Sequence, residues 1–243
     1  MQKFSREYYI RSYECDKDSD LRIITLMNIL QDAADSNATE LGVGFDFCMK
    51  NGLAWMGANY RIIIDRLPKM HEKIRVESWP SEQKRVGAIR DFIIYDENEE
   101  AIIRATSQWI LINIEKKRPV ALKENIPFYS PINERAINYD FEKMEELQKI
   151  DCERKFLVRY DDIDLNKHVN NSVYPLWAFE AIDYDFRENY SPKDIEITFK
   201  KECKLGEKIM VHTDANDLKT LHSITAMNDG RELARIRIEW KLR

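Results

Sequence analysis

The sequence predicts an α+β protein made of two copies of one module. Each half of the chain reads as a short strand, an amphipathic helix and then a series of alternating strands. Two stretches of the first half also align without gaps on two stretches of the second half, in the same order. One helix followed by an antiparallel meander is typical of an α+β module in which the sheet wraps the helix. A unit of this length indicates a duplicated domain, since solenoid repeats span ~20–50 residues.

The duplication rests on residues 60–79, which align with 195–214, and on 93–111, which align with 224–242. Any two amphipathic strands look alike, but two matches in order at nearly the same offset make chance a poor explanation. The shared residues include Ile62/Ile197, Lys69/Lys204, Glu72/Glu207, Ile74/Ile209, Val76/Val211, Arg104/Arg235 and Trp109/Trp240. We therefore predict an N-terminal domain over residues 1–130, a linker over 131–152 and a C-terminal domain over 153–243.

The elements of the two copies correspond. Strands are predicted at Tyr8–Tyr13 and Phe156–Tyr160, each followed by a helix. The first helix has apolar residues at helical spacing from Leu26 to Leu41, with Thr25 as a candidate cap. The second keeps that spacing from Val173 to Tyr184.

Strand patterns then alternate in both copies. Residues 96–99 and 228–230 read as hairpin turns, and the second contains the Asp-Gly signal. Residues 141–150 read as a short helix within the linker.

Composition and charge narrow the class of protein. A net charge of −5 argues against nucleic acid as the main partner. No apolar run reaches the ~18 residues of a membrane span, and the polar N-terminus lacks the apolar core of a signal peptide. The cysteines lie far apart without a Cys/His cluster, so we expect reduced thiols in a cytoplasmic protein, with no metal site and no cofactor.

One polar segment stands out. Asp164, Asn166, His168 and Asn170 occupy every second position just before the second helix. In an extended strand these side chains would point the same way, close to the unpaired N–H groups of a helix N-terminus. A carboxylate, an amide and an imidazole in one space suggest hydrolysis of an acyl compound.

These motifs resemble the acyl-acyl carrier protein thioesterase family. The segment DIDLNKHVNNSVYPLWAFE resembles the family's DLDxNxHVNNxxYxxW signature, and residues 200–203 resemble its basic Glu-Cys segment. The first half also fits in order, through residues 10–14, 30–34, 52–55, 78–80 and 89–92. The resemblance implies two tandem hotdog domains, each a long helix wrapped by a curved antiparallel sheet. It also implies hydrolysis of the thioester between a fatty acyl chain and the phosphopantetheine arm of acyl carrier protein.

The resemblance implies catalytic roles for Asp164, Asn166, His168, Glu202 and Cys203. We favour water activated by the carboxylates and the imidazole, with Asn166 and helix N–H groups holding the oxyanion. A Cys203 thiolate nucleophile is the competing scheme. Plain structural roles also stay open: Asp164 as a turn former and Cys203 as a small buried apolar residue. In a regular strand, Glu202 and Cys203 would face opposite sides.

The first copy lacks this set of residues, since the sequence alignment places Lys17, Ser19 and Leu21 opposite Asp164, Asn166 and His168. We therefore expect one active site, in the second half, with the first half shaping the acyl pocket. The residues that we expect to contact the substrate are Asn170, Asn171, Trp55, Lys200, Lys201 and Lys204.

The lysines are candidates for docking the acidic carrier protein. An acyl-coenzyme A thioesterase on the same fold and a non-catalytic acyl-thioester-binding protein stay open as alternatives. The oligomeric state, including a homodimer, is also open, because the duplication already supplies the pairing that single hotdog domains obtain by dimerising.

Overall fold

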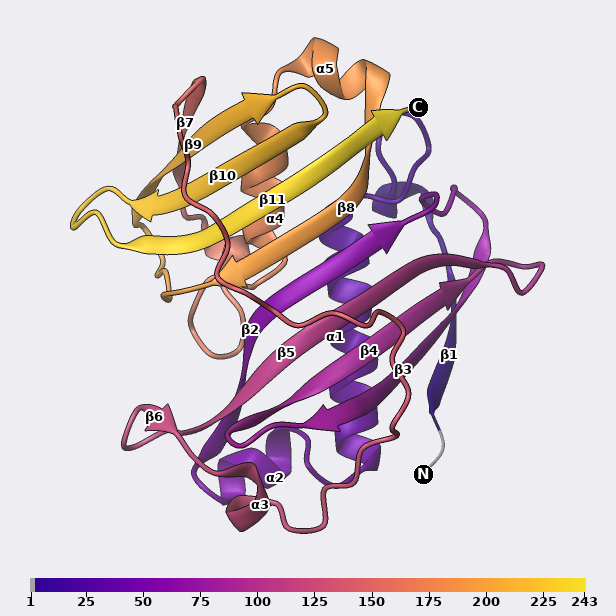
Figure 1. The fold of residues 1–243 in the computed structure, drawn as a ribbon, viewed down its shortest axis with the longest axis vertical. Helices are drawn as coiled ribbons and strands as arrows, with labels where there is room; N and C mark the ends of the chain where they lie inside the picture. The colour runs from indigo at the N-terminus through magenta and orange to yellow at the C-terminus, as the bar shows by residue number, and fades with distance from the viewer. Residues whose placement is uncertain (1–2) are drawn as a thin grey trace. The chain divides into compact units, whose positions relative to one another are not determined.

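The computed structural model describes residues 3–243, which divide into two compact units at Phe141/Glu142. Each unit combines one main helix with an antiparallel sheet (Figure 1), so the α+β prediction is confirmed. The boundary between the units falls inside the segment that we expected to be a linker.

The first unit wraps five long strands around α1 (Ile23–Glu40). The strand order is β1-β3-β4-β5-β2, and all neighbours are antiparallel. The strands are β1 Phe4–Tyr9, β2 Leu53–Ile64, β3 Lys73–Gln83, β4 Gly87–Tyr95 and β5 Ala101–Asn113, with short β6 Arg118–Pro119 pairing with β5. Short helices α2 (Phe45–Lys50) and α3 (Leu122–Asn125) complete the unit.

The second unit repeats this plan around α4 (Val173–Glu180). Its strand order is β7-β9-β10-β11-β8, which is the order of the first unit strand for strand. The strands are β7 Cys152–Leu157, β8 Tyr190–Phe199, β9 Lys208–Asn216, β10 Lys219–Ala226 and β11 Glu232–Leu242. The predicted duplication is therefore confirmed, and so are the hairpin turns after β4 and β10.

The core of each unit lies between helix and sheet. On α1 the residues at helical spacing are buried, including Leu26, Leu30 and Ala33. Strand residues such as Ile62 and Val76 are also buried and belong to the same core. Burial of this kind contributes roughly 25 cal/mol per Å² of apolar surface.

One buried contact between helix and sheet is polar. The guanidinium of Arg90 on β4 donates to Asn37 Oδ1 of α1 at 2.7 Å and to Ser78 Oγ of β3 at 2.9 Å. Arg90 is only 6% exposed.

Several predicted boundaries were wrong, each for a local reason. β1 and β7 end earlier than expected because 3₁₀ turns follow them, η1 (Ser12–Glu14) and η2 (Tyr160–Asp162). The α1 helix begins at Ile23, and Thr25 donates to the Glu14 carbonyl instead of capping it.

The second helix stops at Glu180, short of the predicted end at Tyr184. The Asp183 side chain accepts the N–H groups of Asp185 and Phe186 and so begins a new helix, α5 (Tyr184–Asn189). A capping carboxylate at that point favours a helix start over continuation.

The expected helix over residues 141–150 does not form. This segment is irregular, because side chains of the second sheet bind its backbone groups. Arg235 donates to the Glu145 carbonyl at 2.6 Å, and Asp214 accepts the Gln148 N–H at 2.8 Å. On the first unit, Trp79 Nε1 donates to the Glu134 carbonyl at 2.8 Å. The segment that we expected to be a linker is therefore fastened at both ends, each end to its own unit.

None of the helices within residues 3–243 has the length and apolar character needed to cross a membrane.

Candidate active site

The segment containing Asp164 and His168 forms a tight hairpin loop, not the extended strand that we predicted. Ile163 and Val169 form an antiparallel bridge, and the Asp164 N–H donates to the His168 carbonyl at 2.8 Å. Lys167 reverses the chain with a φ of +64°. Alternation in sequence therefore does not set the direction of these side chains, because they sit in a turn.

Asp164 holds this loop in shape. Its Oδ1 accepts the N–H of Asn166 at 2.8 Å and that of His168 at 3.3 Å. Its Oδ2 lies 3.4 Å from the Asn166 side-chain amide. This is the turn-forming role that the sequence left open for Asp164. The Asn166 side chain is placed on the exposed side of the loop.

The first unit contains the same loop. Asp16 Oδ1 accepts the N–H groups of Asp18 at 2.9 Å and of Asp20 at 3.0 Å, and Ser19 reverses the chain with a φ of +65°. The counterparts of Asp164, Asn166 and His168 are therefore Asp16, Asp18 and Asp20. The sequence alignment that placed Lys17, Ser19 and Leu21 there was wrong by one residue.

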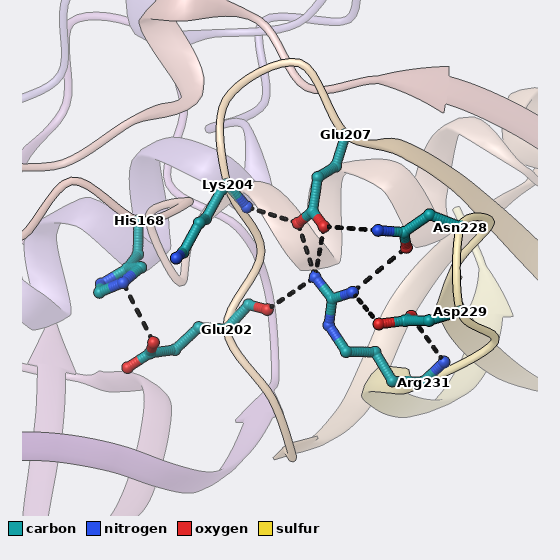
Figure 2. Close-up of polar contacts among 7 residues, drawn as sticks. All are labelled: His168, Glu202, Lys204, Glu207, Asn228, Asp229 and Arg231. Carbon is teal, nitrogen blue, oxygen red and sulfur yellow. Dashed lines mark hydrogen bonds and ion pairs between the residues drawn. The ribbon is translucent and has the colours of Figure 1, made fainter. Parts of the chain in front are cut away.

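Glu202 and His168 meet although they lie far apart in the sequence. His168 Nε2 is 3.0 Å from Glu202 Oε2 (Figure 2). The Val169 N–H donates to the Cys203 carbonyl at 2.9 Å, which ties the two loops together. An ionised carboxylate only accepts hydrogen bonds, so Nε2 carries the proton in this contact.

The neighbours Glu202 and Cys203 face opposite ways. β8 ends at Phe199, so both residues lie in the following loop, with Glu202 exposed and Cys203 fully buried. Burial, and then a hydrogen bond to the Glu207 carboxylate, raise the pKa of the Cys203 thiol to about 12. Almost none of the thiol is ionised at neutral pH, which argues against a thiolate nucleophile.

At the position equivalent to the His168–Glu202 contact, the first unit has a different pair of side chains. Its loops are joined in the same way, by the Leu21 N–H donating to the Pro68 carbonyl at 2.8 Å. Asp20, in the position of His168, forms an ion pair with Lys69 at 2.6 Å. The backbone frame is thus duplicated, while the imidazole and its carboxylate partner belong to the second unit.

The residues that we expected to bind substrate differ in their hydrogen-bond partners and in their burial. Asn170 Oδ1 accepts the Ser172 N–H at 2.9 Å just before α4, and the half-buried Asn171 lies beside it. Trp55, in the first unit, donates from Nε1 to the Val43 carbonyl at 3.0 Å.

The three lysines differ from one another. Lys200 forms an ion pair with Glu232, whereas Lys201 and Lys204 are exposed on the loop that carries Glu202.

Sequence reasoning missed Glu207 and Arg231, which lie beside this loop in Figure 2. The signal that could have found Glu207 is a repeated spacing: Lys69 and Glu72 in the first copy match Lys204 and Glu207 in the second. Within residues 3–243, no three His, Cys, Asp or Glu side chains gather closely enough to hold a metal ion.

A sheet that wraps a helix, and that occurs twice in one chain, defines a tandem hotdog protein. Residues 1–128 match the acyl-ACP thioesterase N-terminal domain, and residues 144–242 match the acyl-ACP thioesterase C-terminal domain. The chain belongs to the acyl-ACP thioesterase family.

Relatives and solved structures agree with this assignment. The chain is 27% identical over 264 residues to the chloroplastic palmitoyl-acyl carrier protein thioesterase of Gossypium hirsutum, covering 98% of this chain and 63% of the relative. The 12:0-ACP thioesterase from Umbellularia californica superposes with a TM-score of 0.88 at 26% identity, covering 99% of this chain and 98% of the other.

An acyl-ACP thioesterase from Bacteroides thetaiotaomicron shares the fold, with a TM-score of 0.89 at 19% identity over 98% of this chain and 97% of the other. The chain spans less than two thirds of the length of the first curated relative.

Proposed function

We propose that this protein hydrolyses the thioester between a fatty acyl chain and the phosphopantetheine arm of acyl carrier protein. The observation that carries the proposal is the 3.0 Å contact between His168 and Glu202, at a position where the otherwise equivalent first-copy loop holds an ion pair. Relatives over nearly the whole chain are named acyl carrier protein thioesterases or hydrolases.

Glu202 acts as the general base in this mechanism. Its carboxylate, held beside the imidazole of His168, takes a proton from a water molecule that attacks the carbonyl carbon. General-base assistance of this kind is typically worth ~10²–10⁴-fold. The tetrahedral intermediate then collapses with cleavage of the C–S bond, and the proton that Glu202 took from water passes to the leaving sulfur, so that the thiol and the free acid are released.

Asn166 and backbone N–H groups before α4 stabilise the oxyanion in the proposal. A side-chain amide has two N–H donors, so Asn166 can contact Asp164 with one and the thioester carbonyl with the other. Losing one oxyanion donor typically costs ~10²–10³ in rate. Asp164 keeps the loop in the shape that presents both Asn166 and His168.

The test is a turnover assay with acyl carrier protein and coenzyme A substrates of graded acyl length. We expect a higher kcat/KM on the carrier-linked substrates. His168→Ala should lower it by at least ~10²-fold, whereas Asp20→Ala, at the equivalent position of the first copy, should leave it within about threefold. Equal rates on both carriers would replace the proposal by a general acyl thioesterase, and the absence of turnover on every substrate would refute it.

The exposed Lys201 and Lys204 are proposed to attract the acidic carrier protein. In the same assay, kcat/KM toward carrier-linked substrates should then fall as salt screens these charges. A rate independent of ionic strength would contradict this docking role. A reducing compartment such as the cytoplasm is also part of the proposal, and the four free cysteines fit it.

Cys203 is predicted to be dispensable for chemistry. We expect Cys203→Ala and Cys203→Ser to keep kcat/KM within about tenfold of the wild type, because the thiol is buried and its pKa is raised to about 12. Removal of an obligatory nucleophile typically costs on the order of 10⁶-fold. A loss of that size in both variants, with an acyl-enzyme trapped in the wild type, would restore the thiolate mechanism.

A further inference from the structure

A compact cluster of charges lies behind Glu202, on the side away from His168 (Figure 2). Glu207 and Arg231, which we call the clasp, form its centre. Arg231 Nη2 lies 2.5 Å and 2.7 Å from the two carboxylate oxygens of Glu207, and Arg231 Nη1 donates to Asp229 Oδ2 at 2.6 Å. Three oxygens from two carboxylates thus hold one planar guanidinium.

The clasp contacts the backbone on both sides of Cys203. Arg231 Nη2 is 3.4 Å from the carbonyl oxygen of Glu202, and the Lys204 N–H donates to Glu207 Oε2 at 2.8 Å. Glu207 also accepts the buried Cys203 thiol. The short loop that carries Glu202 is therefore held at three successive points: the Glu202 carbonyl, the Cys203 side chain and the Lys204 N–H.

Glu207 is ionised at neutral pH. Burial alone would raise its pKa, but the hydrogen bonds from Arg231 and from the Lys204 N–H lower it to about 2. A permanently charged acceptor suits a structural tether and not a group that exchanges protons during turnover.

The first unit binds the equivalent glutamate, Glu72, in a similar way, but its arginine comes from another position: Arg66 lies in the turn itself, whereas Arg231 lies in the hairpin between β10 and β11. Glu72 Oε2 accepts the Lys69 N–H at 2.8 Å, as Glu207 accepts that of Lys204. Arg66 donates to Glu72 at 2.7 Å and 3.0 Å and to Asp96 at 2.7 Å. The residue at the position of Glu202 is Leu67, so the contacts of Glu72 stabilise this turn with no catalytic side chain beside them.

We propose that the Glu207–Arg231 clasp positions the Glu202 carboxylate against His168. Glu207 and Arg231 are positioning residues, since neither reaches the reacting atoms except through Glu202. The inference rests on the proposed function, because it assigns a role within that reaction. It goes further by explaining how an exposed glutamate in a loop keeps a fixed direction.

The experiment compares Glu207→Gln with Glu72→Gln in the full chain. Both variants weaken an equivalent turn, so their melting temperatures should fall by similar amounts. Only Glu207→Gln should lower kcat, by about 10- to 100-fold, as expected for a misplaced catalytic group, with KM changed less than about threefold. Arg231→Lys keeps the charge but loses the planar fork, so its kcat should fall between those of Glu207→Gln and the wild type.

A second measurement does not depend on turnover. The ring cross-peaks of His168 in a ¹H–¹³C NMR spectrum should move in Glu207→Gln and Arg231→Lys and stay in place in Glu72→Gln. An inactive wild type would refute the proposed function, while the spectra would still decide whether the clasp sets the His168–Glu202 contact. Equal kcat in the two glutamine variants, or unmoved His168 peaks in a folded Glu207→Gln, would overturn the clasp.

Discussion

Glu202→Gln should lower kcat by about 10²–10⁴-fold while leaving the fold intact. The amide keeps the size of the side chain but cannot accept the proton of an attacking water. Because Glu202 and His168 are partly exposed, with side chains 61% and 32% accessible, loss of the contact between them should change stability by less than ~1 kcal/mol. Steady-state kinetics on acyl carrier protein substrates and a thermal melt measure the two effects.

The same unit supplies a matched control for Glu202→Gln. His212 Nε2 and Glu153 Oε1 are 3.2 Å apart, with side chains 25% and 53% accessible. They form a pair of the same chemistry and similar exposure between β7 and β9. Glu153→Gln should leave kcat within about twofold. If Glu202→Gln retains comparable activity, Glu202 is not the base and the proposed mechanism is wrong.

The duplicated sheets could be predicted because alternation and spacing survive in both copies. Ile62 and Ile197, for example, match in the sequence and occupy the same position in their sheets, on the strands next to β5 and β11. The contact between Glu202 and His168 could not be predicted in this way, because no local sequence pattern links the two residues. The resemblance to a family named both residues, but only the structure places one against the other at 3.0 Å.

The shape of the site loop could not be predicted from its pattern. Residues such as aspartate and asparagine at alternate positions occur in strands and also in turns where they bind backbone N–H groups. Here the Asp164 carboxylate accepts two backbone N–H groups, so the segment forms a turn and not a strand. Asp16 forms the same kind of turn in the first unit. The sequence alignment of the two loops was wrong by one residue because the equivalent positions share this hydrogen-bond pattern but little sequence similarity.

The second large effect is expected inside the first unit, where Asn37→Leu should destabilise the protein by about 3 kcal/mol. Arg90 is buried, and its side-chain acceptors recorded within residues 3–243, Asn37 and Ser78, are both neutral. Burial also lowers the pKa of Arg90, because the charged guanidinium loses its contact with water. Hydrogen bonds to charged groups contribute ~1.5–3 kcal/mol. A buried charged donor that loses its acceptor costs more free energy than a buried neutral donor that does so.

Urea unfolding followed by tryptophan fluorescence measures this loss, and two further variants isolate its cause. Asn59→Leu removes a neutral amide contact of the same unit, 2.7 Å from Asn59 Nδ2 to Gln108 Oε1, and should cost only about 1 kcal/mol. In the double variant Asn37→Leu with Arg90→Met, much of the stability should return, because apolar groups of similar size can replace a buried charged contact without loss. If the double variant is no more stable than Asn37→Leu alone, the penalty comes from altered packing against α1, and the account based on a stranded charge is wrong.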